Sequence, residues 1–333
     1  MKHINVALFV PDEGCPHRCS FCNQKTISGK TKKLTLSDID KAVEIASEKG
    51  DGKGEIAFFG GSFTAIEKEY MLSLLKRAKL YIDKGLFKGI RISTRPDCIN
   101  EEVLAVLKKY GVSSIELGCQ SMNDEVLLLN GRGHTAEDVR KAAKLIKEYG
   151  FEFGVQIMTG LYGDSDELAV KTAESLIALS PDTARIYPTV VLEGTRLSEL
   201  YEKGEYTPQT VEEAAELCAR LLSMFEEKNI KVIRLGLHSG GNVEEGFVAG
   251  AYHPAFREIC ESKIYLSKIL ALIDKEQIPE GDITVEVNSK CVSALVGQKR
   301  CNIQKLRNMG YNCKVQQNDS YKKYDVSVRL TKS

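Results

Sequence analysis

The chain has 333 residues, of which 43% are hydrophobic, and its 46 basic and 46 acidic side chains give a formal net charge of zero. This length allows a large buried core in one or two domains. Residues 1–10 lack the apolar run of a signal peptide, and no stretch is long and apolar enough to span a membrane. We therefore expect a cytoplasmic protein without a membrane partner, whose ten cysteines are reduced.

Strand-like apolar runs alternate with segments of helical periodicity from residue 4 onward. The first helix is expected after Ser37, an N-cap residue three positions before Asp40. Six strands are expected, at Ile4–Val10, Glu55–Phe59, Ile90–Ser93, Ser114–Gly118, Glu152–Met158 and Thr183–Tyr187. Strands that alternate with helices favour right-handed crossovers and a parallel sheet. We predict an α/β fold, a partial (β/α)6 barrel of TIM type, with a doubly wound open sheet as the alternative.

The segment after the sixth strand combines a turn-rich loop, a long helix over Val211–Lys228 and a strand over Lys231–Leu235. We expect these elements to cap the barrel on its substrate side. A helix over Pro254–Ile273 then leads to a stretch with Pro279 and Gly281, which predicts a domain boundary. The predicted division is a barrel over 1–240, a helical extension packing on it over 241–280, and a small domain over 281–333.

The C-terminal segment differs from the rest in charge. Residues 281–333 contain ten Lys and Arg against four Asp and Glu, which leaves residues 1–280 with a net charge of −6. Its pattern predicts a small α+β domain of βααββ order. The expected elements are strand Ile283–Val287, helices Lys290–Val296 and Asn302–Met309, and strands Asn312–Gln316 and Tyr324–Leu330.

The motif with the most specific chemistry is the loop Gly14–Gln24, in which Cys15, Cys19 and Cys22 stand at CxxxCxxC spacing. Thiolates hold iron-sulfur clusters, and a four-iron cluster normally takes four of them. Because no fourth cysteine lies near these three, one iron would remain open. A structural zinc site that includes His17 is the alternative, but such sites commonly use two separated half-sites.

Other unusual residues follow the predicted strands. Gly60-Gly61-Ser62 comes after the second strand, Thr94–Asp97 after the third, and Cys119-Gln120-Ser121 after the fourth. Barrel enzymes assemble their active sites at the carboxyl ends of the strands. We therefore expect these segments to meet the cysteine loop.

These motifs resemble the radical S-adenosylmethionine (radical SAM) superfamily, and more closely the radical domain of the Elongator catalytic subunit and its bacterial relatives. Besides the cysteines, the resemblance rests on Phe59–Thr64, Ser93–Asp97, Glu116–Ser121, Asn130–Thr135, Met158–Asp164, Arg185–Pro188 and Ala251–Arg257. It implies a radical SAM enzyme in which the three cysteines hold a four-iron four-sulfur cluster and S-adenosylmethionine binds the open iron. Reductive cleavage would then give a 5′-deoxyadenosyl radical, with ferredoxin or flavodoxin as the electron donor.

The resemblance also suggests cofactor-binding residues. Gly60 and Gly61 would let the backbone approach the methionyl amine, and Ser62 stands where many members of the superfamily have an acidic residue. Candidates for the ribose hydroxyls and the cofactor carboxylate are Ser93, Gln120 and Arg132. The alternative for each is an ordinary turn or strand-end residue.

The basic domain resembles a KH domain, whose GxxG loop clamps the backbone of single-stranded nucleic acid. The matching loop is Gly297-Gln298-Lys299-Arg300, in which Arg300 replaces the second glycine while Lys299 and Arg300 add positive charge. A small packing domain with a solvated basic face is the alternative.

The two resemblances together imply an RNA substrate, such as the wobble uridine of tRNA. The barrel and the basic domain account for all 333 residues, so the source of any transferred group stays open. Two alternatives also stay open: a radical enzyme for a small molecule, similar to oxygen-independent coproporphyrinogen oxidase, and a non-catalytic RNA-binding protein with a cluster. The oligomeric state is not predicted.

Overall fold

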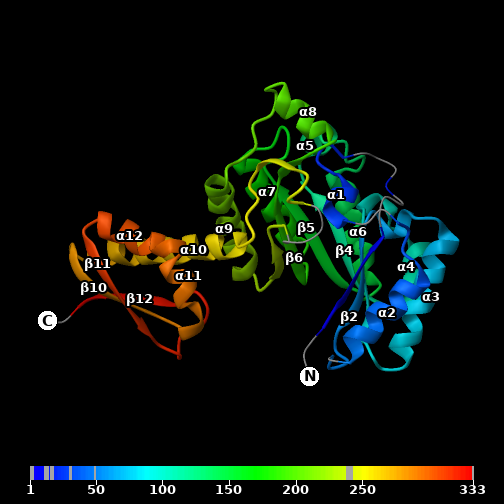
Figure 1. Cartoon of the computed structure of the whole chain (residues 1–333), viewed down its shortest axis with the longest axis horizontal. Coiled ribbons are helices and arrows are strands. Elements are labelled where there is room, and N and C mark those ends of the chain that lie inside the picture. Colours follow the sequence, from blue (N-terminus) through cyan, green and yellow to red (C-terminus); the bar gives the residue numbers. More distant parts are fainter. Residues whose placement is uncertain are drawn as a thin grey trace.

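The computed structural model describes residues 4–10, 15, 19–29, 32–48, 50–237 and 243–331. His17, part of the zinc alternative, lies outside the described residues. Seven parallel strands form one curved sheet in the order β1-β2-β3-β4-β5-β6-β8 (Figure 1). They are β1 (Val6–Val10), β2 (Glu55–Gly60), β3 (Gly89–Thr94), β4 (Val112–Gln120), β5 (Glu152–Thr159), β6 (Thr183–Pro188) and β8 (Lys231–Leu235).

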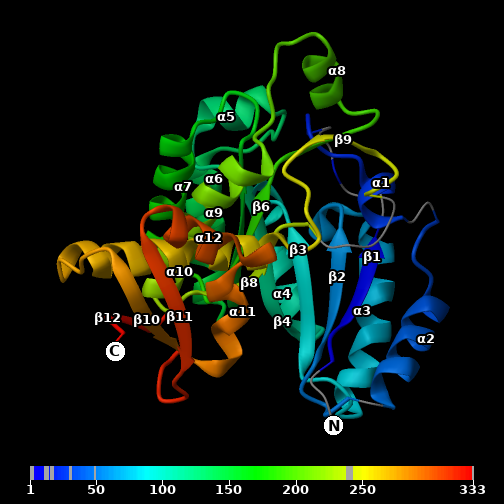
Figure 2. The same ribbon diagram turned by 60° about the vertical axis from the view of Figure 1, so that its left-hand side comes forward.

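Helices cover the outer face of this sheet, and their buried apolar side chains form the main core with the outward residues of the strands (Figure 2). The helices that contribute to this core are α2 (Leu36–Ser47), α3 (Lys68–Asp83), α4 (Glu101–Lys109), α6 (Ala136–Glu148), α7 (Asp166–Ala178), α9 (Val211–Glu227) and α10 (Phe256–Lys275). Three shorter helices, α1 (Gln24–Ser28), α5 (Asp124–Leu129) and α8 (Arg196–Glu202), add no described side chain to it. An antiparallel pair, β7 (Val190–Leu192) and β9 (Phe247–Gly250), lies beyond the carboxyl ends of the strands. This arrangement confirms the predicted α/β partial barrel.

Two local predictions are wrong. The strand Lys231–Leu235 is not part of a cap but pairs with β6 and adds a seventh strand to the sheet, because its buried Val232 and Leu235 join the main core. Helix α2 takes its N-cap from Thr35 rather than Ser37. The Thr35 hydroxyl accepts from the Asp38 backbone N–H, and the Asp38 carboxylate accepts from the Thr35 N–H, which completes a capping box.

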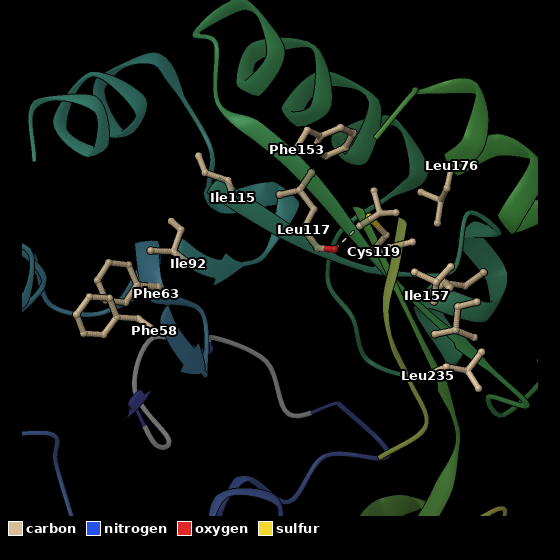
Figure 3. Close-up of a cluster of buried hydrophobic side chains, with 14 of the residues drawn as sticks. Phe58, Phe63, Ile92, Ile115, Leu117, Cys119, Phe153, Ile157, Leu176 and Leu235 are labelled. Atoms are coloured by element: carbon tan, nitrogen blue, oxygen red, sulfur yellow. Dashed lines mark hydrogen bonds between the residues drawn. The ribbon is translucent and has the colours of Figure 1, made fainter. Parts of the chain in front are cut away.

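The two faces of β4 differ in chemistry. Ile115, Leu117 and Cys119 point into the core between sheet and helices (Figure 3), as the two-residue period of a strand requires. Glu116 and Gly118 alternate with them and therefore face the interior of the barrel. The strand runs two residues further than predicted, to Gln120, so Cys119 and Gln120 end the strand rather than follow it.

Buried ion pairs cross this polar interior. The Glu116 carboxylate, 1% exposed, accepts from Arg185 at 2.5 and 2.9 Å and from Arg91 at 3.3 Å. Arg91 also donates to Glu55 at 2.8 Å and to Glu152 at 2.7 Å. These contacts join five neighbouring strands, β2 to β6. Removing one partner of such a buried pair leaves an uncompensated charge and typically costs about 3–5 kcal/mol.

The C-terminal segment forms a second, smaller domain in the predicted βααββ order. Its strands β10 (Gly281–Val287), β11 (Tyr311–Gln317) and β12 (Val326–Leu330) form a sheet in the order β11-β10-β12, with β10 parallel to β11 and antiparallel to β12. Its helices are α11 (Val292–Val296) and α12 (Cys301–Asn308). The last strand begins at Val326, two residues later than predicted. No helix among the described residues is long and apolar enough to cross a membrane.

Helix α10 belongs to both cores. Its first half places Phe256 and Cys260 in the core of the barrel, and its second half places Tyr265, Ile269 and Ile273 in the core of the C-terminal domain. In both views α10 runs from the barrel into the small domain, coloured orange to red (Figures 1 and 2). One helix therefore positions the two domains against each other.

Replacing Ile269 with Ala should destabilise the C-terminal domain by about 2–5 kcal/mol, because it empties a fully buried site in its core. Urea unfolding followed by circular dichroism measures this loss of free energy. The control is Lys268→Ala, at an exposed position of the same helix, which should change stability by less than about 0.5 kcal/mol. Equal stability of the two variants would show that α10 does not support the small domain.

Candidate active site

The cysteine loop is held by backbone and side-chain contacts at Ser20. The Ser20 N–H and hydroxyl both donate to the buried Asn130, at 3.0 Å to its carbonyl and 2.6 Å to its side-chain oxygen. The Leu197 N–H, at the start of α8, donates to the Ser20 carbonyl at 2.8 Å. Phe21 packs against a small apolar cluster that includes Val191 of β7 and Leu197 of α8. These contacts fix the described residues Ser20 and Phe21 to segments that follow β4 and β7.

The three cysteine sulfurs influence one another. Burial and repulsion from Cys19 and Cys15 raise the pKa of Cys22 to about 12. Partial burial and Cys19 raise the pKa of Cys15, while the Ser62 backbone N–H, Arg95 and Arg132 lower it. Thiols that repel each other as thiolates are suited to a multivalent cation, which binds the deprotonated form. Three cysteine thiolates are the donor type that holds an iron-sulfur cluster. Among the described residues, no three His, Cys, Asp or Glu side chains are already grouped closely enough to hold a metal ion.

Two guanidinium groups lie next to the cysteines. Arg132, 7% exposed, donates from Nη1 to the Cys19 sulfur at 3.1 Å and from Nη2 to the Gly118 carbonyl at 2.6 Å. Arg95 donates to the Arg132 carbonyl and forms a bidentate pair with Asp97 at 3.0 Å for both bonds. Positive charge and hydrogen bonds at cluster sulfurs make reduction of a cluster easier.

The Gly60-Gly61-Ser62 turn lies against the ends of β1 and β3. Gly60 has φ +118°, and a Cβ there would lie 2.5 Å from the Val10 carbonyl oxygen, so only glycine fits. The buried Ser62 hydroxyl is 2.8 Å from the Thr94 hydroxyl and accepts from the Arg95 backbone N–H at 3.2 Å. Ser62 thus holds the turn in place under the cysteine loop.

Gln120 has a strained backbone, with φ +67° at a point where the register between β4 and β5 shifts. A non-glycine residue in this region costs about 1–3 kcal/mol and is found most often at functional sites. The strain places the Gln120 side chain beside Gly118 and Arg132: a Cβ on Gly118 would lie 3.3 Å from the Gln120 amide nitrogen and 3.4 Å from Arg132 Nη2.

Four buried polar atoms around this site have no hydrogen-bond partner within the described part of the chain: Arg95 Nη1, Arg132 Nε, Gln120 Oε1 and His134 Nδ1. Burial and the nearby Arg132 and Arg95 lower the pKa of His134 to about 4, so the imidazole is neutral at pH 7. Unpartnered buried polar atoms cost free energy unless a ligand satisfies them. The two arginine nitrogens can donate to a carboxylate, and Gln120 Oε1 and His134 Nδ1 can accept from an amine or a hydroxyl group. S-adenosylmethionine carries all three kinds of group.

Ser62, Gln120 and Arg132 lie near the described cysteines, whereas four predicted site residues do not. Ser93 lies deeper in the barrel, where its hydroxyl accepts from Gln156 at 3.0 Å. Gly297, Lys299 and Arg300 lie on the C-terminal domain.

Three residues of this region, Arg95, His134 and Gln156, had no role in the prediction from sequence. Arg95 and His134 stand inside motifs that carried the family resemblance. Gln156 could have been found from the two-residue period of β5, which turns it toward the barrel interior.

Comparisons with known proteins agree with this geometry. Residues 10–176, half of the chain, match the radical SAM superfamily, and residues 181–265 match the radical SAM C-terminal domain. An uncharacterised protein of Methanocaldococcus jannaschii is 35% identical over 58% of this chain and 63% of its own length. A tRNA uridine(34) acetyltransferase of Methanocaldococcus infernus is 34% identical over 50% of this chain and 35% of its own length.

A solved structure of the archaeal Methanocaldococcus infernus Elp3 has the same fold, with a TM-score of 0.59 and 24% identity over 83% of this chain and 64% of that one. This chain spans less than two thirds of the length of the relatives named here. The motif-based resemblance to the Elongator catalytic subunit is thereby confirmed. The chain belongs to the radical SAM superfamily, and a four-iron four-sulfur cluster and S-adenosylmethionine are its cofactors.

Proposed function

We propose that Cys15, Cys19 and Cys22 hold the cluster and that the chain uses it to modify RNA, with the wobble uridine of tRNA as the substrate. The observation that carries the first part is the contact of Arg132 with the Cys19 sulfur at 3.1 Å, amid four unpartnered buried polar atoms. When bound, the cluster and S-adenosylmethionine supply a carbon-centred radical that removes a hydrogen atom from the substrate. A cytoplasmic electron donor such as ferredoxin or flavodoxin completes the proposal.

The chain's own residues have separate roles in this proposal. Gly60, Gly61 and Ser62 form a turn without bulky side chains, along which the methionyl group would lie. Gln120 and Arg132 offer an amide oxygen and a guanidinium nitrogen that lack partners. Ser93 keeps its hydroxyl proton free to donate to a ribose oxygen, because the Ser93 oxygen already accepts from Gln156.

Replacing Cys19 with Ala should abolish cluster binding and cleavage of S-adenosylmethionine, because the cluster then lacks one of its three protein ligands. Iron and sulfide analysis after anaerobic reconstitution measures the first effect, and release of 5′-deoxyadenosine after dithionite addition measures the second. Cys313→Ala, on the C-terminal sheet, is the matched control and should keep both. A Cys19→Ala protein with full iron content would refute the cluster assignment.

The RNA part of the proposal has two supports. A relative is named for tRNA uridine(34), although this chain covers only 35% of its length. The C-terminal domain presents the loop Gly297–Arg300, in which Lys299 and Arg300 are exposed and have φ of +51° and +61°. Arg300 therefore adopts the left-handed backbone conformation that glycine adopts most easily, although it carries a side chain.

The start of this loop is packed against α10. Gly297 has φ +77°, and a Cβ there would lie 2.5 Å from the Cys301 sulfur and 2.7 Å from the Ser262 hydroxyl. Asn302 donates to the Ser262 carbonyl at 2.8 Å. Only glycine at position 297 allows the loop to come this close to α10. Lys299 and Arg300, further along the loop, remain exposed to solvent.

Replacing both Lys299 and Arg300 with Gln should weaken binding of an anticodon stem-loop RNA and lower the slope of log affinity against log salt by about 1.4, at about 0.7 per lost phosphate contact. Fluorescence anisotropy at several salt concentrations gives both quantities. A double variant with Lys53→Gln and Lys84→Gln, at two exposed positions of the barrel, removes the same two positive charges and serves as the control for net charge. An unchanged slope in the double variant of Lys299 and Arg300 would place the RNA contact elsewhere.

The decisive experiment for the substrate compares tRNA nucleosides from cells with and without the gene. We expect a modified wobble uridine to be replaced by its precursor in the deletion strain and restored by the wild-type gene, but not by the Cys19→Ala gene. Identical nucleoside profiles in all strains would contradict the tRNA proposal and favour a small-molecule substrate.

A further inference from the structure

Charges inside the barrel are separated along its axis. The acidic residues Glu55 and Glu152 begin strands β2 and β5. Arg185 lies within β6, and Arg234 lies one residue before the carboxyl end of β8. Arg132 lies at the same end, next to the cysteines. Arg132 and Arg234 therefore bring positive charge to the mouth of the barrel, although residues 1–280 carry a net charge of −6. An anion that enters this end meets a favourable local potential.

One of these cations, Arg185, is already neutralised by a carboxylate. Arg185 uses Nε and Nη2 on the Glu116 carboxylate, its Nη1 lies 3.5 Å from the Tyr187 hydroxyl, and its guanidinium lies 4.9 Å from the centre of the Phe59 ring. Burial alone would lower the pKa of Arg185, but the Glu116 carboxylate outweighs it and raises the pKa. Arg185 therefore has little capacity left for a ligand.

Arg234 differs from Arg185, its neighbour in the sheet register. It is half-buried, and its Nε donates to the Gly236 carbonyl at 3.0 Å. Across the described ranges, no carboxylate pairs with it and its Nη1 and Nη2 make no hydrogen bond. Burial, and then repulsion from Arg185 and Arg257, lower its pKa, with Tyr187 acting in the opposite direction.

The position of Arg234 is set by the chain around it. Gly236 has φ +81°, and a Cβ there would lie 3.0 Å from the Phe256 side chain, so this turn accepts glycine alone. The turn presents the Gly236 carbonyl to Nε and leaves the two terminal nitrogens of Arg234 together, in the planar fork that binds an oxyanion with two hydrogen bonds.

We propose that Arg234 is an oxyanion-binding residue inside the mouth of the barrel and takes a phosphate of the RNA substrate, with Arg185 and Tyr187 beside it. This inference rests on the proposed RNA function. We favour RNA over a small anion because Arg234 lies on an edge strand of the sheet. Among the described strands, β8 pairs only with β6. A single-stranded polymer with a phosphate at each nucleotide can approach the interior along such an edge, where a positively charged group would bind its backbone.

The test measures how fast phenylglyoxal modifies individual arginines, read by peptide mass spectrometry on reconstituted protein without S-adenosylmethionine. Inorganic phosphate and an anticodon stem-loop RNA should each slow modification of Arg234 at least fivefold. Arg185, paired with Glu116, should be slow in every sample, and Arg140, half-exposed on α6, should be equally fast in every sample.

The outcomes separate this inference from the proposed function. An Arg234 rate that neither phosphate nor RNA changes would overturn the oxyanion site and show a solvated arginine. Protection by phosphate, or by acetate, without protection by RNA would uphold the oxyanion site, overturn its assignment to RNA and point to a small anionic substrate.

A pair of variants gives a second readout. Arg234→Gln should weaken stem-loop binding about tenfold, as expected for loss of hydrogen bonds to a charged group, and lower the salt slope by about 0.7. Arg234→Lys should keep the slope. Both should keep full cluster iron, since Arg234 has no hydrogen bond to the cysteine loop in the described residues. An unchanged affinity and slope in Arg234→Gln would reject the phosphate contact.

Discussion

The buried carboxylate of Glu116 is the interaction on which the barrel interior depends. It accepts from Arg91, Arg185 and Gln156, and so connects β4 to β3, β5 and β6. An isolated carboxylate at this depth would be strongly unfavourable, and its cationic partners would be equally so without it. Glu116 therefore keeps the interior polar without leaving Arg91 or Arg185 uncompensated, and it fixes where positive charge remains available. That place is the mouth of the barrel, at Arg132 and Arg234.

The sequence predicted the parallel sheet because each strand combines buried apolar residues with a turn and an amphipathic helix. It misplaced the strand Lys231–Leu235, because one strand beyond a long loop and a long helix carries no local sign of its partner. Pairing with β6 is decided by Val232 and Leu235 filling the main core, which is a long-range effect. The N-cap at Thr35 was missed for a simpler reason: Thr35 and Ser37 both precede an acidic residue by three positions.

For the site, spacing predicted the cysteines and the Gly60 turn, since both require residue types that few other roles demand. Arg95, His134 and Gln156 were not predicted, because the role of a common polar residue depends on where the fold places it. Arg95 and His134 are buried with one unpartnered atom each, and Gln156 bonds Ser93 and Glu116 across the barrel interior. The net charge of −6 over residues 1–280 also gives the wrong sign for the charge that a ligand meets near Arg132 and Arg234. Net charge averages the whole surface, whereas a ligand inside the barrel responds to the few groups within a Debye length of about 8–10 Å.

Helix α10 links the two places at which the proposal puts RNA. Its Ser262 contacts Gly297, at the start of the basic loop, and its first residue, Phe256, packs against Gly236 two positions after Arg234. Lys263 on the same helix binds Glu212 and Glu216 of α9 at 2.6 and 2.5 Å, which ties α10 to the barrel. Because α10 packs in the core of the barrel at one end and in the core of the C-terminal domain at the other, we expect little motion of the basic loop relative to the mouth of the barrel. For an RNA bound at the loop Gly297–Arg300, the distance from the bound phosphates to the target nucleotide in the barrel would then be set by α10 and not by a flexible linker.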